Sequence, residues 1–269
     1  ALHPQSDVDR LYLPRSEGGR GLQQIRQTME EEKRSLSEYL SSRREAALQE
    51  VKREGLLIDG TKRKFRKQEL QSRRQRWSSK PLHGQYLKNI EGKVDETLTW
   101  AWLKHGELKK ETEGFIMAAQ DQALRTNAIK CKIDKTSNSS MCRLCGDREE
   151  TVDHLVSSCS KIAQTDYKER HNKVAAMLHW NLCKKYGLPV TDKWWEHQTE
   201  KVMQSGEVKI LWDFKIQTDK HLSHNIPDIT VVEKAQTYLV DVAIPGDGRI
   251  DQKEQEKIQK YKDLNVEVE

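Results

Sequence analysis

The chain lacks long hydrophobic runs and is poor in apolar residues overall. Only 35% of its 269 residues are apolar, whereas 33% are charged. No segment approaches the roughly eighteen consecutive apolar residues that cross a membrane, and no series of charged, apolar and small residues marks a secretory signal. We therefore expect no membrane association, modest hydrophobic cores and plentiful solvated or extended helices.

Cysteine is also scarce, and its odd number is informative. The chain has five cysteines, and an odd count without a secretory signal favours a reducing compartment. Three of them, Cys142, Cys145 and Cys159, lie within one short segment, whereas Cys131 and Cys183 stand apart. The first residue is Ala and not Met, so we expect the chain to be part of a longer protein.

The short segment has the pattern Cys142-x2-Cys145-x8-His154-x4-Cys159. Zinc takes four thiolate or imidazole ligands in a tetrahedron, and a two-residue gap between cysteines lets both sulfurs reach one ion from a tight turn. Thr151 can cap a short helix whose first turn carries His154. The pattern therefore favours a structural zinc site, with buried free cysteines or a disulfide as the alternatives.

Positive charge is concentrated towards the N-terminus. The net charge is +5, but Lys and Arg exceed Asp and Glu only within residues 1–80, and the remainder is slightly acidic. Cations neutralise phosphates and aromatic rings stack on bases, so the densest basic segment is a candidate nucleic-acid-binding arm. The alternative is a solvated helix anchored in the core by Phe65 and Trp77. The candidate contacts are Lys62, Arg63, Lys64, Arg66, Lys67, Arg73, Arg74, Arg76 and Trp77.

Apolar periodicity and helix-breaking residues predict helices first and strands later. Three closely spaced glycines, Gly18, Gly19 and Gly21, indicate a turn or a close approach of the backbone. We place a domain boundary at Gly187–Pro189, and the strands and final helix beyond it suggest a small α/β sheet, giving an α+β chain. The expected helices cover residues 23–54, 100–127, 160–186 and 250–264, and the expected strands cover residues 208–217, 229–232 and 238–244.

Two carboxylates lie on neighbouring predicted strands. Asp228 begins one strand and Asp241 lies within the next, where a charge is unfavourable unless it is paired or bound to a metal. Carboxylates that converge from adjacent strands suit magnesium, whose bound water can attack a phosphodiester. Lys257 and Lys260 lie one turn apart on the following helix, beside Tyr261. The alternative is that Asp228 caps a turn, Asp241 pairs with a lysine, and the helix is merely solvated.

Several segments occur in an order that resembles a known family. They are Arg10–Leu22, Lys80–Tyr86, Thr112–Asn127, the Cys142–Cys159 pattern, Arg170–His171, Pro227–Asp228, Asp241 and Glu256–Tyr261. The series resembles the C-terminal region of the polyprotein of non-LTR (LINE-type) retrotransposons that carry a restriction-like endonuclease. The resemblance covers nearly the whole chain, and its specificity comes from the joint order of the motifs.

The resemblance implies three parts. Residues 1–98 would be a basic helical linker that follows a reverse transcriptase, and residues 99–190 a helical region with a CCHC zinc knuckle. Residues 191–269 would be a small α/β restriction-endonuclease-like domain of the PD-(D/E)XK type. In that domain Asp228 and Asp241 would hold catalytic magnesium and Lys257 would be the catalytic lysine, with Lys260 and Tyr261 in support.

In that family the nuclease nicks target DNA in the nucleus, and the freed 3′ hydroxyl primes reverse transcription of the element's RNA. Target DNA and element RNA are therefore the expected partners. Ala243 stands where an ordinary D-x-K motif has lysine, which fits the family's displaced lysine on the helix. Polymerase motifs are absent, and the chain stops at Glu269, where the family fold continues with at least one further strand. A non-catalytic zinc-dependent DNA- or RNA-binding module and a degenerate retroelement remnant remain the alternatives.

Overall fold

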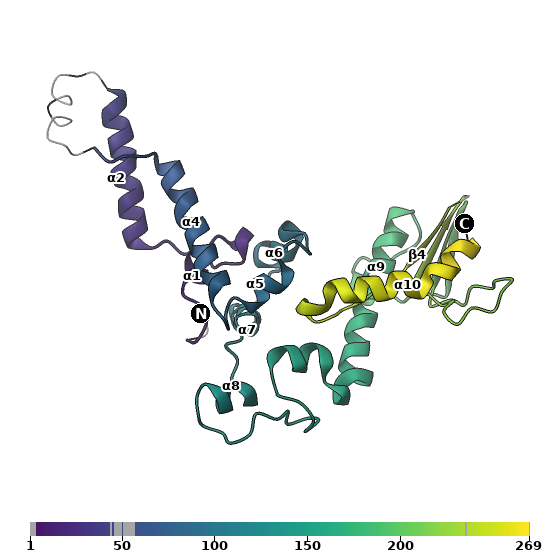
Figure 1. Cartoon of the computed structure of the whole chain (residues 1–269). Helices are drawn as coiled ribbons and strands as arrows, with labels where there is room; N and C mark the ends of the chain where they lie inside the picture. The colour runs from purple at the N-terminus through teal and green to yellow at the C-terminus, as the bar shows by residue number, and fades with distance from the viewer. Residues whose placement is uncertain (1–3, 44, 46–49, 51–56, 235, 269) are drawn as a thin grey trace. The chain divides into compact units, whose positions relative to one another are not determined.

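The computed structural model describes residues 4–43, 45, 50, 57–234 and 236–268. The chain divides into two compact units, residues 1–134 and residues 135–269 (Figure 1). The boundaries expected from the sequence, after residues 98 and 190, both fall inside these units. No helix among the described residues is both long enough and apolar enough to cross a membrane.

The N-terminal unit is helical. Its two long helices, α2 (Ile25–Ser42) and α4 (Lys62–Ser79), pack against each other and run in opposite directions (Figure 1). The helix expected over residues 23–54 is thus seen as far as Ser42, and most of its remainder lies outside the described residues. The shorter elements are α1 (Asp9–Tyr12), η1 (Arg15–Glu17), α5 (Gln85–Ile90), α6 (Glu96–His105), α7 (Lys110–Gln120) and α8 (Asn127–Lys132).

The core of this unit is organised around a buried arginine. The Arg10 side chain is completely buried, and its guanidinium lies 4.6 Å from the ring centre of Trp77. It forms an ion pair of 2.8 Å with Asp121, which is also completely buried. Its Nε donates to the carbonyl oxygen of Gly18 at 2.8 Å. Because every one of these partners comes from a different segment, Arg10 ties the first helix to α4, α7 and the glycine-rich turn.

The glycine-rich turn confirms the expected close approach of the backbone. Gly18 has a φ of +83°, and a Cβ atom there would lie 2.7 Å from the Trp100 ring. A Cβ on Gly19 would lie 2.0 Å from the carbonyl oxygen of Leu13. Only glycine tolerates both the left-handed backbone and these contacts, so the turn can lie directly on the aromatic core.

The C-terminal unit combines two long helices with one antiparallel sheet. The sheet has the order β1-β2-β3-β4, with β1 (Val202–Ser205), β2 (Val208–Trp212), β3 (Ile229–Glu233) and β4 (Gln236–Val240). The long helices are α9 (Lys168–Lys185) and α10 (Ile250–Val268). Short helical turns complete the unit: η2 (His154–Ser158), η3 (Ser160–Ile162), η4 (Ala163–Tyr167), η5 (Trp194–Glu196) and η6 (Asp247–Arg249).

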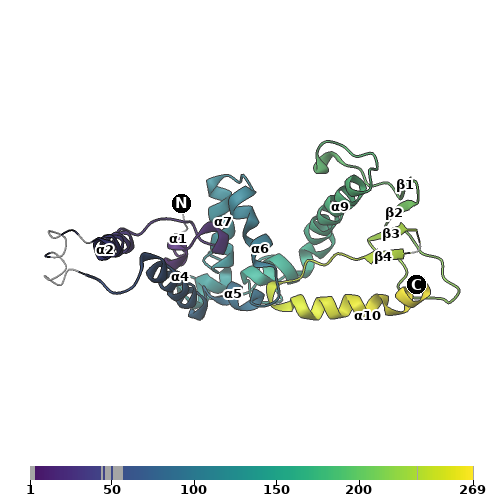
Figure 2. The same cartoon turned by 90° about the horizontal axis from the view of Figure 1, so that it is seen from above.

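The long helices α9 and α10 both lie beside the sheet (Figure 2). Ile229 and Val231 of β3 pack in one buried cluster with Cys183 of α9, so this face is covered by α9. Thr230 points to the other face, and its register partner Leu239 lines a cavity together with Tyr261 of α10. The alternation of side chains along an antiparallel pair thus assigns one face to each helix.

The chain is α+β, as the sequence predicts, although the details differ. The expected strands at residues 208–217, 229–232 and 238–244 correspond to β2, β3 and β4, but β2 ends at Trp212 and β4 at Val240. The sequence interpretation missed β1, a four-residue, mostly exposed edge strand with no apolar alternation. The sequence predicted that Asp241 lies within a strand. In the structure it directly follows the end of β4.

Candidate metal centre and acidic strand-end site

The predicted zinc ligands converge on one point. One ligand atom each from Cys142, Cys145, His154 and Cys159 lies within 4.8 Å of all the others. The Cys145 Sγ atom is 3.4 Å from His154 Nε2, close to the ~3.6 Å that a sulfur and a nitrogen share around one tetrahedral zinc ion. Cys142, Cys159 and His154 are buried. The cluster can therefore hold a metal ion.

A tight turn positions the first two cysteines. The Cys142 amide donates to the Arg148 carbonyl at 2.7 Å, and the Gly146 amide donates to the Cys142 carbonyl at 2.8 Å. Gly146 has a φ of +70° and thus closes the turn in a backbone conformation that favours glycine. The Leu144 amide also points at Cys142 Sγ, 3.4 Å away. The turn thus directs both a thiol and an amide donor towards the ligand cluster.

A buried carboxylate holds this turn in place. Glu150 is completely buried and accepts from the Arg143 backbone amide at 2.9 Å and from the Arg143 Nε at 2.8 Å. Such a two-point contact fixes the residue between the two cysteines. The Cys145 pKa is lowered to about 6, first by a hydrogen bond from the Asp147 backbone amide, which favours the thiolate that a metal needs.

A short helical turn begins with His154, as the sequence predicts, but it ends at Ser158, so Cys159 follows the turn in an extended conformation instead of lying on the helix. Thr151 caps it, because its Oγ1 atom accepts from the His154 amide at 3.0 Å. Tyr167 then locks its end: its hydroxyl accepts from the Cys159 amide at 3.0 Å and donates to the Leu155 carbonyl at 2.9 Å. Both ligands therefore lie on a backbone that is fixed at its start and at its end.

The two predicted catalytic acids lie at the ends of paired strands, with Asp228 directly before β3 and Asp241 directly after β4. Ile229 of β3 pairs with Val240 of β4, so extending the register by one residue brings Asp228 opposite Asp241. Residues opposite each other in an antiparallel pair point to the same face of the sheet. Here that is the face of Thr230 and Leu239, which α10 covers.

The predicted residues of α10 all contact Asp241. Lys257 forms an ion pair with its Oδ2 atom, and the Tyr261 hydroxyl donates to its Oδ1 atom at 2.7 Å. The Lys260 ammonium is 3.7 Å from Oδ1 and donates to the Tyr261 hydroxyl at 2.8 Å. Burial raises the pKa of the Tyr261 hydroxyl, and the negative charges of Asp241 and Asp228 raise it further. Both carboxylates therefore act on one hydroxyl group.

Asp228 has a histidine neighbour that sequence reasoning did not assign to the site. The His171 Nε2 atom of α9 lies 3.2 Å from Asp228 Oδ2 and 3.1 Å from the Val242 carbonyl oxygen. The Val242 amide donates to the same Oδ2 atom at 2.6 Å. From the sequence, His171 is named only as part of the Arg170–His171 segment and has no assigned role, and only the tertiary structure brings it to the site.

The ligand cluster and the acidic site are physically linked. The chain leaves the acidic site through a turn that ends in η6 and α10, and a Cβ on Gly246 would lie 2.5 Å from Asp153 Oδ1 and 2.6 Å from Ser157 Oγ. Arg249 also contacts the Ser157 Oγ atom at 3.1 Å. The helical turn that carries His154 therefore packs directly against the start of the helix that carries Lys257.

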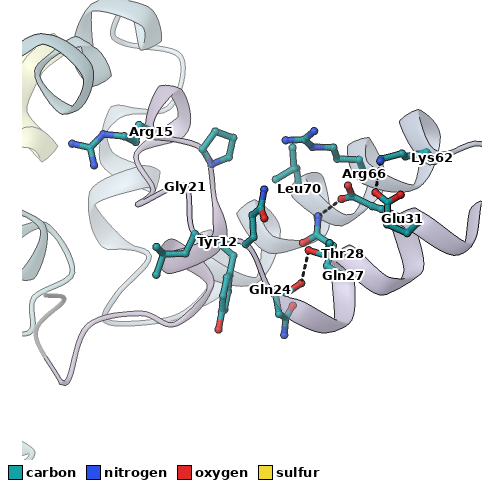
Figure 3. Close-up of a pocket in the computed structure, with 14 residues that line it drawn as sticks. Tyr12, Arg15, Gly21, Gln24, Gln27, Thr28, Glu31, Lys62, Arg66 and Leu70 are labelled. Atoms are coloured by element: carbon teal, nitrogen blue, oxygen red, sulfur yellow. Dashed lines mark hydrogen bonds and ion pairs between the residues drawn. The ribbon is translucent and has the colours of Figure 1, made fainter. Parts of the chain in front are cut away.

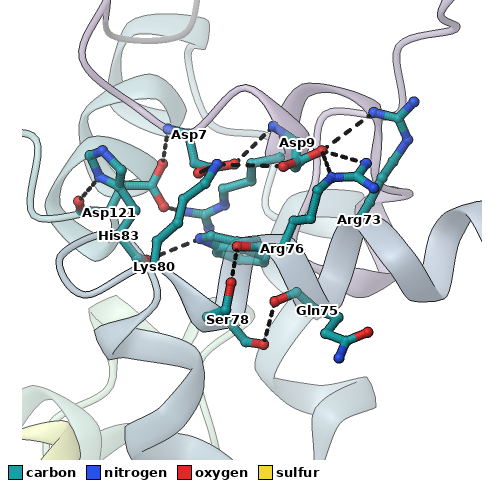
Figure 4. Close-up of polar contacts among 12 residues, drawn as sticks. Asp7, Asp9, Arg73, Gln75, Arg76, Ser78, Lys80, His83 and Asp121 are labelled. Atoms are coloured by element: carbon teal, nitrogen blue, oxygen red, sulfur yellow. Dashed lines mark hydrogen bonds and ion pairs between the residues drawn. The ribbon is translucent and has the colours of Figure 1, made fainter.

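The candidate nucleic-acid contacts on α4 divide into three groups. Trp77 is completely buried and stacks under Arg10, so the structure gives it the anchoring role and leaves no face for a base. Arg73, also buried, and Arg76 both contact Asp9 of the first helix, which also neighbours Lys80 (Figure 4). These residues hold the unit together.

Two further cations of α4 are paired at the surface. Lys62 pairs with Glu32 at 2.7 Å and Arg74 with Glu96 at 2.6 Å. Lys62 also lines a cleft between α2, α4 and the glycine-rich turn, as does Arg66 (Figure 3). Four cations have no acidic partner among the described residues, and all four are exposed: Arg63, Lys64, Arg66 and Lys67.

Comparison with known proteins identifies no relative: no family model, no curated protein and no solved structure matches the chain. The retrotransposon resemblance therefore stays a prediction from the motifs. The structure adds the geometry of the four candidate metal ligands and the contacts that α10 makes with Asp241. It also separates the buried or paired cations of α4 from the exposed, unpaired ones.

Proposed function

We propose that the chain is the nucleic-acid-binding and nuclease portion of a longer protein and nicks DNA by metal-dependent hydrolysis of a phosphodiester. This is the activity that the retrotransposon resemblance implies. The observation that carries the proposal is the convergence of Lys257, Lys260 and Tyr261 on Asp241, with Asp228 opposite Asp241 in the extended register. Amines and paired carboxylates within one small volume are what phosphodiester hydrolysis requires.

The donor set suits magnesium. Asp228 and Asp241 offer carboxylate oxygens, and magnesium prefers oxygen ligands while keeping several of its waters. Such an ion, when bound, supplies a water of lowered pKa as the nucleophile. Lys257 would then place its ammonium beside the reacting phosphate, and Lys260 with Tyr261 would orient the Asp241 carboxylate. His171, through its contact with Asp228, is a positioning residue for the second acid.

The cysteine and histidine cluster has a structural role in this proposal. Cys142, Cys145, His154 and Cys159 offer three thiols and one imidazole, a donor set that zinc prefers. All four positions are protein ligands, which leaves no open position for a substrate and is typical of a structural site. The exposed, unpaired cations of α4 would hold the DNA or RNA backbone.

A plasmid-nicking assay tests the proposal. The full chain, loaded with zinc, is incubated with supercoiled plasmid in the presence of magnesium or manganese. We expect nicking that disappears in Asp228→Asn and in Asp241→Asn. Asp263→Asn is the matched control, because Asp263 lies two residues after Tyr261 on α10 but is exposed, and it should nick like the wild type.

Two outcomes would contradict the assignment. Undiminished nicking by both the Asp228 and the Asp241 variants would show that the activity resides elsewhere or in a contaminant. A folded, zinc-loaded wild type that binds DNA but never nicks it would remove the catalytic role. Circular dichroism of each variant at the assay temperature separates lost chemistry from lost folding.

A specific observation favours a second candidate, a non-catalytic DNA- or RNA-binding module. Asp241 is already neutralised by Lys257 and hydrogen-bonded by Tyr261, and Asp228 accepts from the Val242 amide. These contacts give each acid at least one polar partner without any metal ion, as is usual for structural carboxylates. Salt-sensitive binding without cleavage is the result that this second candidate predicts.

A further inference from the structure

A second group of metal-binding side chains lies in the C-terminal unit, outside the predicted cluster. One ligand atom each from His179, Cys183 and His197 lies within 4.8 Å of the other two. His179 and Cys183 are completely buried. No sequence motif connects them, because Cys183 stands apart from the cysteine pattern and His197 lies beyond the helix that carries His179 and Cys183.

The fold brings the three residues together from two elements. His179 and Cys183 are four residues apart on α9, so they share one face of that helix. His197 follows η5, a short turn that packs against α9, and its ring stacks on that of His179 with 5.1 Å between the ring centres. Trp212 of β2 meets the His179 ring edge-on at 5.6 Å and thereby fixes its orientation.

The distances approach those of a metal site. The Cys183 Sγ atom is 3.6 Å from His179 Nδ1, and tetrahedral zinc spaces a sulfur and a nitrogen ligand by about 3.6 Å. The His179 Nδ1 and His197 Nε2 atoms are 2.8 Å apart, whereas zinc spaces two nitrogens by about 3.3 Å. A small movement of the half-exposed His197 would therefore complete the geometry.

The surroundings provide for a fourth ligand and for entry of the ion. His197 borders an open cavity that is also lined by Glu196, Glu200 and Met203. The Met203 sulfur is 3.5 Å from Cys183 Sγ. Thus His179 and Cys183 offer ligand atoms from the protein interior, while the side towards His197 faces a cavity that water can enter and the Met203 thioether lies nearby.

We propose that His179, Cys183 and His197 hold a second zinc ion, which ties η5 to α9 and to the sheet. Two imidazoles and one thiolate form a donor set that zinc accepts. Cys183 belongs to the same buried cluster as Ile210, Ile229 and Val231, so an ion here would stabilise the layer between α9 and the sheet. The proposal does not depend on the nuclease assignment.

The competing explanation is a hydrogen bond between the two histidines. A nitrogen-to-nitrogen distance of 2.8 Å is that of a hydrogen bond, and a buried thiol can pack beside it as a small apolar group. This explanation predicts that only the four-ligand cluster binds metal. The two explanations therefore differ in the number of zinc ions that one folded chain retains.

Counting zinc in the purified full chain tests the proposal. After dialysis against metal-free buffer, zinc is measured by plasma mass spectrometry and protein by amino-acid analysis. We expect two zinc ions per wild-type chain and one each in Cys183→Ser, His197→Asn and Cys145→Ser. Cys131→Ser is the control, since Cys131 lies in the other unit and belongs to neither cluster, and it should retain two.

Cobalt substitution identifies which site each variant has lost. Charge-transfer absorption grows with the number of thiolates bound to cobalt. The single ion in Cys145→Ser should thus show one thiolate, whereas the ion in Cys183→Ser should show three. His197→Asn keeps the test sharp, because His197 is only half-buried and its loss leaves the core intact.

The proposal is overturned by any of three results. The first is a folded wild type that retains a single zinc ion, with no zinc in Cys145→Ser. The second is retention of two zinc ions per chain by Cys183→Ser and His197→Asn, when circular dichroism shows that both variants are folded. The third is binding of Cu⁺ but not of zinc by Cys145→Ser, when each ion is offered alone. That result would assign the site of His179, Cys183 and His197 to a softer metal.

Discussion

Removal of two unpaired cations from α4 should weaken the salt dependence of DNA binding more than removal of two paired ones. Arg63 and Lys67 lie one turn apart on α4, are exposed, and have no acidic partner among the described residues. Lys62 and Arg74 lie on the same helix but pair with Glu32 and Glu96. The two double variants therefore remove the same charge from the same element.

The magnitude follows from counterion release. Each phosphate that a cation neutralises adds about 0.9 to the slope of log affinity against log salt for duplex DNA. If Arg63 and Lys67 each contact a phosphate, Arg63→Gln/Lys67→Gln should lower the slope by about 1.8. Lys62→Gln/Arg74→Gln should lower it by well under half as much, because a paired cation must leave a carboxylate before it binds a phosphate.

Fluorescence anisotropy with a labelled duplex, from about 50 to about 250 mM potassium chloride, measures these slopes. Equal losses in both double variants would mean that the ion pairs dissolve on binding and that exposure does not select the contacts. An unchanged slope in Arg63→Gln/Lys67→Gln, with affinity intact, would place the nucleic acid away from this part of α4. The basic arm would then be a solvated helix face.

Two substitutions test the buried polar contacts. Asp121→Asn leaves the charge of Arg10 uncompensated in the core and should lower the free energy of unfolding by about 3–5 kcal/mol, whereas Asp134→Asn at a surface pair should change it by under about 1 kcal/mol. If urea unfolding of Asp121→Asn shows a loss of unfolding free energy under about 1 kcal/mol, the Arg10–Asp121 ion pair is not a main stabilising contact of this unit. Tyr261→Phe removes the 2.7 Å hydrogen bond to the nearly buried Asp241. The loss should lower the free energy of unfolding by about 1–3 kcal/mol. An unchanged urea midpoint would show that solvent replaces the hydroxyl.

Local sequence patterns predicted the features whose parts lie close together in the chain. The ligands from Cys142 to Cys159 are joined by a single turn and a single helical turn, so their spacing alone limits where the side chains can go. Thr151 could be recognised as a helix cap for the same reason. Asp228 and Asp241 could be paired because they flank one hairpin, in which the register follows from the length of the connection.

Features that depend on distant segments could not be predicted. The approach of His171 to Asp228 joins residues 57 positions apart, and the Arg170–His171 pair in the sequence does not indicate which carboxylate the histidine approaches. The basic helix α4 shows the same limit. Arg63 and Arg73 lie in similar basic stretches of the sequence, yet Arg73 is buried and forms an ion pair with Asp9, whereas Arg63 is exposed. Composition predicts how many cations a helix carries, whereas tertiary packing decides which of them are available.

If the Cys142–Cys159 cluster holds a metal ion, its contacts with the segment that leads to α10 would give that ion a role in positioning the acidic site. A structural metal ion contributes folding free energy to the residues around it, and an ion held by this cluster would act on the helical turn from His154 to Ser158. Gly246 and Arg249 lie directly against that turn, and α10 begins at the next residue. Because Lys257 and Tyr261 reach Asp241 from α10, anything that loosens the turn shifts the start of the helix that holds both. Loss of the metal should therefore disturb the contacts of Asp241 even though none of its partners is a metal ligand.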